Sequence, residues 1–392
     1  MSDAVMILSA RRTPIGAFQG VLAAMTAPQL GSAAIRAAIE AAGIQAADLD
    51  ETIMGCVLPA GLGQAPARQA AIGAGVPVQV PATTVNKMCG SGMKAIMLAA
   101  DQLAAGHAAL VLAGGLESMS NAPYLLLKAR AGYRMGHGEI LDHMFYDGLQ
   151  SPWDGKLMGC FADATAEKYG FTRTEQDAFA AESVRRAMRA LQAGEFDTEV
   201  TPVSVKNRKG TTLVERDETP FTCDLAKIAT LKPAFGASGT VTAASSSSIS
   251  DGAAAAVLTR ESVVRDRGLR PVARLTAWAS SALAPEWFTT APVAAIEKVL
   301  KAAGWTVGDV DLFEVNEAFA VVAMAARRDL AIDHQKLNVN GGACALGHPV
   351  GATGARIITT LIHALQNRGG RRGVAALCIG GGEATAVAIE LV

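Results

Sequence analysis

The feature that most constrains the fold of this chain is a phrase that occurs twice. Ala-Ala-Gly at 41–43 precedes Asp-Leu-Asp at 48–50, and Ala-Ala-Gly at 302–304 precedes Asp-Val-Asp at 309–311. Both parts of the phrase are displaced by the same 261 positions, from 43 to 304 and from 48 to 309. In the first copy an amphipathic helix leads through the phrase into a strand, so the pattern indicates an internal duplication of a helix–strand unit.

A second pair of matching segments follows in the same order. Gly-Gly is expected to close an apolar strand at 114 and again at 380, a displacement of 266 positions that implies short insertions between the halves. Within each half, runs of Val, Ile and Leu alternate with alanine-rich helical stretches and glycine-rich connections. This alternation is typical of helices packed on a mostly parallel sheet, and it predicts a layered α/β architecture.

One long segment interrupts the repeat. Residues from about 119 to 249 have no counterpart in the second half, and we interpret them as an inserted lid, because insertions in rigid scaffolds often carry binding loops. A surface extension without function is the alternative. The predicted division is residues 1–118 with 250–270 as the N-terminal half, 119–249 as the insertion and 271–392 as the C-terminal half.

Composition narrows the class of partner. The 392 residues are 50% hydrophobic, enough to bury a large core. They include 35 Lys and Arg against 36 Asp and Glu, and this balance of charge gives no reason to expect a nucleic acid or an anionic membrane as a binding partner. No apolar run is long enough to span a bilayer, and neither end resembles a signal peptide or a lipidation or peroxisomal motif. The six cysteines and six histidines lack disulfide or metal-ligand spacing. We expect a soluble, cytoplasmic protein without a metal.

Cys89 is the first candidate catalytic residue. It lies in VNKMCGSGMKA (85–95), between an expected strand and a helix whose first turn contains two glycines. Unpaired N–H groups and the positive end of a helix dipole stabilise a thiolate, so the pattern predicts a nucleophile with a lowered pKa. An inert buried cysteine is the equally weighted alternative.

His348 is the second candidate. It precedes a proline in GGACALGHPVGATGAR (341–356), and a residue before proline is biased toward extended backbone. We therefore expect His348 to project from a loop that shapes a pocket. A structural loop histidine and a phosphate-binding loop remain alternatives, although the Lys-Ser/Thr ending of a P-loop is absent.

Two further segments contain candidate catalytic residues. LCIGGGEA (377–384) places Cys378 at the end of an apolar strand, and NEAFA (316–320) follows the strand 312–315. On local grounds Asn316 is expected to cap the helix that begins there. Two cysteines and a histidine suit an acyl transfer, which needs a nucleophile, its activating base and a second base for a carbon acid.

Taken together and in this order, the four segments resemble the thiolase family, and the resemblance runs from ARRTPIGAF (10–18) to the final strand. It implies the thiolase fold, a duplicated five-layered αβαβα core with an inserted loop (lid) domain. It also implies an acyltransferase that uses coenzyme A and acetyl-CoA as substrates and holds no permanent cofactor.

The resemblance also implies roles for the candidate residues. Cys89 would attack a thioester and carry the acyl group, His348 would take its proton, and Cys378 would be the second base. His348 and a water held by Asn316 would form an oxyanion hole for the enolate, while the N–H groups of Cys89 and Gly380 would bind the acyl-enzyme oxyanion.

Other residues match positions that contact coenzyme A in the family. Ser247, Phe235 and Phe319 correspond to the lining of its tunnel, although aromatic residues beside a core are often plain packing. Leu157, directly before Met158, stands where short-chain members usually have a histidine, which would suit a longer or branched substrate.

The favoured function is the reversible Claisen condensation of two acetyl-CoA to acetoacetyl-CoA and CoA, in fatty acid metabolism. The alternative is a 3-ketoacyl-CoA thiolase that acts on longer chains in β-oxidation. Cys378 argues against the related decarboxylating condensing enzymes, and a non-catalytic acyl-CoA or lipid carrier would be expected to lose Cys89, His348 or Cys378. The family implies a homo-oligomer, a dimer or a homotetramer.

Overall fold

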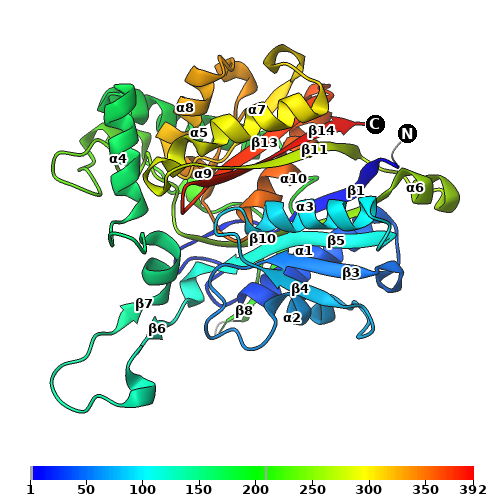
Figure 1. Cartoon of the computed structure of the whole chain (residues 1–392), viewed down its shortest axis with the longest axis horizontal. Coiled ribbons are helices and arrows are strands. Elements are labelled where there is room, and N and C mark those ends of the chain that lie inside the picture. Colours follow the sequence, from blue (N-terminus) through cyan, green and yellow to red (C-terminus); the bar gives the residue numbers. More distant parts are fainter. Residues whose placement is uncertain (1–2, 208–209) are drawn as a thin grey trace.

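The chain folds around two similar half-sheets. The computed structural model describes residues 3–207 and 210–392. In spatial order the N-terminal half-sheet contains β4 (Ala82–Val85), β3 (Glu51–Gly55), β5 (Leu110–Ser118), β10 (Ser250–Arg260) and β1 (Val5–Arg12), with β2 (Gly16–Ala17) beside β10. The C-terminal half-sheet contains β12 (Leu312–Val315), β13 (Arg372–Ile379), β14 (Glu383–Leu391) and β11 (Ala273–Ala282). Short pairing between β1 and β11 joins the halves, as Figure 1 shows.

The two half-sheets repeat one topology. The order β3-β5-β10-β1 matches β12-β13-β14-β11, and in both sets the first pair is parallel and the next two are antiparallel. The prediction of a mostly parallel sheet is therefore wrong. In the C-terminal half the reason is local, because the turn at 380–382 joins β13 directly to β14 and so short a connection can link only antiparallel strands.

The repeated phrase marks equivalent places in the two halves. Helix α1 (Ala27–Ala42) ends at Gly43 with φ 66°, and α7 (Ala291–Ala303) ends at Gly304 with φ 70°. Glycine adopts this left-handed conformation without the steric penalty of a side chain. A single 3-10 turn, η1 (Ala46–Asp48) or η8 (Val307–Asp309), then leads into β3 or β12.

Helices form the other three layers, giving the five-layered αβαβα arrangement. Helices α1 and α2 (Pro66–Gly73) cover one outer face, and α7 and α8 (Ala320–Asp329) cover the other (Figure 1). Between the half-sheets, α3 (Ser91–Ala104) and α10 (Thr353–Arg368) share a core with strands of both halves. A Cβ added at Gly92 would lie 2.9 Å from the backbone nitrogen of Ala355, so glycine lets the first turns of α3 and α10 touch.

Gly114 and Gly115 lie inside β5 and do not close it, so that expectation is wrong. A Cβ added at Gly115 would lie 2.9 Å from the Cα of Ala352, closer than ordinary van der Waals contact. The glycine is needed because the loop before α10 packs directly on the strand. This contact determines how closely the loop that contains His348 packs against β5.

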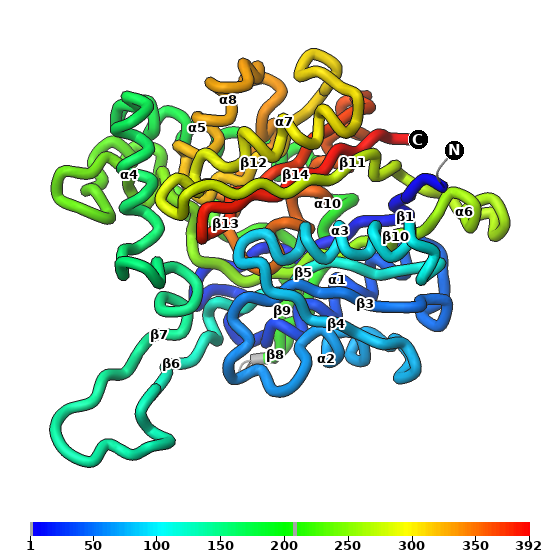
Figure 2. The backbone as a smooth tube through the Cα atoms, viewed as in Figure 1, coloured from blue at the N-terminus to red at the C-terminus, as the bar shows by residue number. Residues whose placement is uncertain are grey.

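The segment between β5 and β10 contains the remaining elements of the first half. In chain order these elements are η2 (Met119–Asn121), β6 (Tyr124–Leu125), η3 (Ala129–Ala131), β7 (Leu141–Asp142), η4 (Met144–Leu149), α4 (Met158–Tyr169), α5 (Arg173–Gln192), β8 (Val203–Asn207), β9 (Gly210–Val214), η5 (Thr219–Phe221) and η6 (Leu225–Thr230). The loop between β6 and β7 projects from the rest of the chain, as Figure 2 shows. Both α4 and α5 contact α8 of the C-terminal half.

The remaining elements are short. Helix α6 (Glu261–Arg267) follows β10 in the N-terminal half, and the C-terminal half adds η7 (Pro285–Thr290), η9 (His334–Lys336) and the one-turn helix α9 (Ala343–Leu346). No helix in the described part of the chain is long and apolar enough to cross a membrane.

Candidate functional site

Most of the predicted site residues line one small cavity. Its volume is about 190 Å³, and both halves and the intervening segment contribute to its wall. The predicted residues that line it are Cys89, Leu157, Met158, Phe235, Ser247, Phe319, His348 and Gly380. Cys378 and Asn316 do not line it, and both are buried.

A sharp turn holds Cys89 between β4 and α3. Met88, directly before it, has φ 48°, a left-handed conformation that costs of order 1–3 kcal/mol for a residue with a side chain. The hydroxyl of Ser91 stabilises the turn, because it accepts the N–H of Lys87 at 2.8 Å and donates to the carbonyl of Met88 at 2.6 Å. The predicted strand–turn–helix setting of Cys89 is confirmed.

The expected lowering of the Cys89 pKa is wrong. Burial raises the pKa of this thiol, and the carboxylate of Glu117 raises it further. The backbone N–H groups of Gly380 and of Cys89 itself favour the thiolate but do not reverse the rise in pKa. Removal from water outweighs the helix terminus here, so the resting residue is a thiol that needs a base.

His348 lies in the loop between α9 and α10, as its place before Pro349 predicts. Its Nδ1 lies 2.6 Å from the hydroxyl oxygen of Thr353, whereas its buried Nε2 has no hydrogen-bond partner in the part of the chain that the structure describes. Burial and the positive charge of Arg356 lower the pKa of His348 to about 3. The imidazole is therefore neutral at ordinary pH.

Cys378 and Asn316 come together because β12 and β13 are parallel neighbours. Val315 pairs with Ala376, so the carboxyl ends of the two strands lie side by side. Burial raises the pKa of the Cys378 thiol well above its usual range, and Cys89 raises it further, which places the two thiols near each other.

Asn316 is not a helix cap. Helix α8 begins at Ala320 with Phe319 at its N-cap, and both polar side-chain atoms of Asn316 are buried without a partner among residues 3–207 and 210–392. Its backbone N–H donates to the carbonyl of Ala376 at 2.9 Å. The strand pairing therefore extends to Asn316, and its amide remains free to hold a ligand or a water.

The sequence analysis missed Glu117 at the buried end of β5. Its carboxylate accepts the N–H groups of Val57 at 2.9 Å, Leu58 at 3.1 Å and Gly351 at 2.9 Å. Burial raises the pKa of Glu117 to about 7 despite these bonds. Its one signal was an acid directly after the apolar run LVLAGGL (110–116), and its hydrogen bonds tie the loop near His348 to the N-terminal half.

Aromatic side chains form the outer wall of the cavity. The ring of Phe319 packs edge to face against Phe235 at 5.8 Å and against Phe288 at 6.4 Å between centroids. Phe288 also lines the cavity and was missed, because nothing local distinguishes it from a core aromatic. The hydroxyl of Ser247 donates to the carbonyl of Ala318 at 3.0 Å, which fixes the loop beside Phe319.

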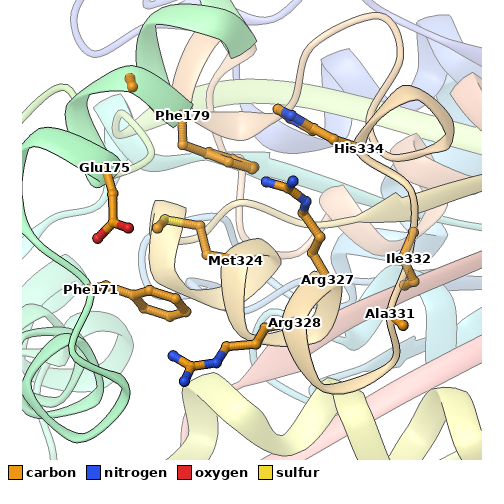
Figure 3. Close-up of a pocket in the computed structure, with 10 residues that line it drawn as sticks. Phe171, Glu175, Phe179, Met324, Arg327, Arg328, Ala331, Ile332 and His334 are labelled. Atoms are coloured by element: carbon orange, nitrogen blue, oxygen red, sulfur yellow. The ribbon is translucent and has the colours of Figure 1, made fainter.

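A larger hollow lies elsewhere on the molecule. It has a volume of about 640 Å³ between α5 and α8, and Phe171, Phe179, Arg327 and Arg328 are in its wall (Figure 3). None of the described residues that line it is a cysteine. The smaller cavity, which contains the nucleophile candidate, is therefore the candidate active site. Across the described residues no group of His, Cys, Asp and Glu side chains could hold a metal ion.

Comparison with known proteins agrees with this site. The model of the thiolase N-terminal domain matches residues 5–262, and that of the thiolase C-terminal domain matches residues 269–391. The chain belongs to the thiolase family. This confirms the family and the fold that the four segments predicted.

Relatives of this thiolase match along its whole length. Acetyl-CoA acetyltransferases of Escherichia coli (strain K12) and Pseudomonas aeruginosa are 49% and 48% identical, and each alignment covers 98% of both chains. The solved acetyl-CoA acetyltransferase of Bacillus anthracis superposes with a TM-score of 0.97 at 39% identity, covering 100% of this chain and 99% of that one. The Acat5 thiolase of Ascaris suum, solved with coenzyme A, gives 0.95 at 41% identity, covering 99% and 100%.

Proposed function

We propose that this thiolase is an acetyl-CoA C-acetyltransferase, which condenses two acetyl-CoA to acetoacetyl-CoA and CoA, reversibly, through an acyl-enzyme on Cys89. One observation carries the proposal: Cys89, His348 and Gly380 line the same small cavity, and Nε2 of His348 has no hydrogen-bond partner among the described residues. The names of its full-length relatives support the acetyl substrate. A non-catalytic carrier would have no use for this combination.

The first half-reaction forms the acyl-enzyme. His348 Nε2 takes the proton of Cys89, and the sulfur attacks the carbonyl carbon of acetyl-CoA. The oxyanion that develops is bound by the N–H groups of Cys89 and Gly380, the same groups that favour the Cys89 thiolate. When the carbon–sulfur bond to CoA breaks, Cys378 gives its proton to the departing thiolate.

The second half-reaction forms the carbon–carbon bond. The Cys378 thiolate removes an α-proton from a second acetyl-CoA, and the resulting enolate attacks the acetyl group on Cys89. Protonated His348 and a water held by Asn316 stabilise the enolate oxygen, which gives the unpaired amide of Asn316 a role. The Cys89 thiolate then leaves and regains its proton from His348, so every group returns to its starting state.

The wall of the cavity supports a short acyl group. Phe288 and Phe319 are both buried and both face the cavity, so an acyl chain cannot lengthen in that direction without displacing a ring. Leu157 favours the alternative, a thiolase of longer 3-ketoacyl-CoA, because it lines the cavity with an apolar side chain. The aromatic wall outweighs a single leucine, so acetyl transfer remains our proposal.

Coenzyme A is proposed to bind as substrate against Ser247, Phe235, Phe319 and Met158, which line the cavity, with no resident cofactor. We also retain the proposed division into residues 1–118 with 250–270, 119–249 as lid and 271–392. A cytoplasmic location and a role in fatty acid metabolism complete the proposal.

A homotetramer is proposed on the basis of the loop between β6 and β7. Large apolar side chains are exposed along it: Tyr124 is 68% exposed, Met135 96% and Ile140 66%. Contiguous exposed apolar groups of this kind mark contact surfaces. A second copy of the chain is the partner that the family resemblance implies.

The test combines intact-mass spectrometry with steady-state kinetics. Incubation with acetyl-CoA should add one acetyl group to wild type and none to Cys89→Ala, and acetoacetyl-CoA should be cleaved with higher kcat/KM than 3-ketoacyl-CoA of six to ten carbons. Preference for the longer substrates would replace the acetyl assignment with the 3-ketoacyl-CoA one. An adduct on Cys89→Ala, or no turnover of any substrate, would overturn the proposed mechanism.

A further inference from the structure

Thr353 is the first residue of α10, and its hydroxyl oxygen has two partners. It lies 2.6 Å from Nδ1 of His348 and 2.9 Å from the carbonyl oxygen of Pro349. The side chain is fully buried. Both contacts arise within one short stretch, GHPVGAT (347–353), so the turn that starts α10 also delivers the hydroxyl to the imidazole.

The position of the protons follows from the chemistry of the partners. A hydroxyl has one hydrogen to donate and lone pairs to accept, whereas a backbone carbonyl can only accept. Both contacts are hydrogen bonds at the same time only when the hydrogen of Thr353 points to the carbonyl of Pro349 and its oxygen accepts Nδ1–H of His348. A neutral imidazole has one N–H, so in this arrangement it is on Nδ1 and Nε2 has the lone pair.

We propose that Thr353 is a positioning residue, which fixes the tautomer of His348 that can take the proton of Cys89. This inference rests on the proposed function, since it assigns a proton that the acyl transfer moves. Nε2 is buried and has no partner within the described ranges, and His348 lines the same cavity as Cys89. With the other tautomer, Nε2 would present a hydrogen to the thiol and could not act as its base.

Thr353 also determines how the imidazole is oriented. The backbone N–H of His348 donates to the carbonyl of Ser248 at 3.1 Å, which anchors the main chain but leaves the ring free to rotate. The hydroxyl of Thr353 is the hydrogen-bond partner of the ring among the described residues. Because a hydroxyl is neutral, it selects the tautomer and the ring angle without the charge that a carboxylate would place beside the imidazole.

Thr353→Val tests the proposal, because valine keeps the shape of the side chain and removes the acceptor. Loss of a hydrogen bond that orients a functional histidine typically lowers activity ~10- to 100-fold. We expect that loss in kcat for acetoacetyl-CoA cleavage, with little change in KM for CoA, and a matching fall in the rate at which iodoacetamide alkylates Cys89. Thr353→Ser restores the hydroxyl and should recover most of both rates.

Thr359→Val is the matched control. Thr359 lies on the same helix, is equally buried and donates to the carbonyl of Ala355 at 3.0 Å, the same i to i−4 bond that Thr353 makes to Pro349. Its hydroxyl makes no hydrogen bond to a catalytic candidate among the described residues, so its variant should keep both rates. Equal losses in the two valine variants would mean that the hydroxyls only stabilise the helix, and the proposal would be wrong.

Nitrogen-15 NMR of the histidine-labelled protein reports the tautomer directly, with the His348 signals identified by their absence in His348→Ala. The expected spectrum has a protonated Nδ1 and an unprotonated Nε2 in wild type, and a mixture in Thr353→Val. A proton on Nε2 in wild type would refute the inference. A wild type that cleaves no substrate, yet shows the expected tautomer and alkylation rates, would count against the proposed function alone.

Discussion

Gly115→Ala should reduce catalysis although Gly115 makes no contact with substrate. The added Cβ would lie 2.0 Å from the carbonyl oxygen of Gly351 and 2.9 Å from the Cα of Ala352, whereas ordinary van der Waals contact begins near 3.4 Å. The difference at the closest atom, 3.4 minus 2.0, means that the backbone of the loop from Gly347 to Ala352 must move by about 1.4 Å there, because both partners are backbone and β5 is held between two strands.

The displaced loop contains His348, so the magnitude can be estimated. Misplacing a catalytic group by ~1 Å costs ~100-fold in rate, and overpacking a core typically destabilises a protein by ~1–3 kcal/mol. On that scale we expect kcat to fall by roughly 100-fold or more, with a destabilisation of at least ~1–3 kcal/mol. Steady-state kinetics and urea unfolding measure the two effects.

Gly308→Ala is the control for the added methyl group. Gly308 is exposed on η8, and its Cβ would meet only the Thr306 hydroxyl at 3.6 Å, so activity and stability should stay at the wild-type level. If Gly115→Ala keeps both wild-type kcat and wild-type stability, the contact between β5 and the His348 loop does not position the imidazole, and the argument from close packing is refuted.

Three further outcomes are expected. The folded-state pKa of His348 is lowered to about 3 from 6.5, so the unfolded chain binds a proton at higher pH than the folded chain does. The free energy of unfolding should therefore fall by an amount on the order of 5 kcal/mol as pH falls from 6.5 toward 3. In His348→Gln the free energy of unfolding should fall less steeply over this pH range, and an unchanged slope would contradict the assignment. Phe288→Ala should destabilise the protein by ~3–5 kcal/mol and raise kcat/KM for six-carbon relative to four-carbon substrates. If the ratio of these two kcat/KM values is unchanged, Phe288 does not limit the length of the acyl chain. Met135→Glu should lower the assembly state in sedimentation without affecting unfolding of the subunit, and an unchanged assembly would exclude the β6–β7 loop from the interface.

Sequence patterns predicted the repeated architecture because their signals act over short distances. A glycine after a helix and a strand a few residues later were enough to identify equivalent units at 43 and 304. The same local rules failed where neighbours in space decide the outcome. Gly-Gly at 114 resembles a strand end, but it lies inside β5 because a loop more than two hundred residues later packs against it.

Through the family resemblance, the sequence alone also predicted most of the candidate residues that line the small cavity. It could not predict their protonation. Helix position suggested a lowered pKa for Cys89, yet burial raises it, and burial is a property of the assembled layers. Asn316 resembles a helix cap in its local sequence, but the parallel pairing of β12 with β13 places it at the strand end, where its amide has no partner among the described residues.

The contacts between residues far apart in the sequence were decided only by the tertiary structure. Glu117 and Gly351 are 234 positions apart, and Phe288 joins the cavity wall from a turn that no motif marks. Local sequence determines the turns and the chemical groups at each strand and helix end. The free energy of packing determines which of those ends meet, how far they are removed from water and therefore which proton each one holds.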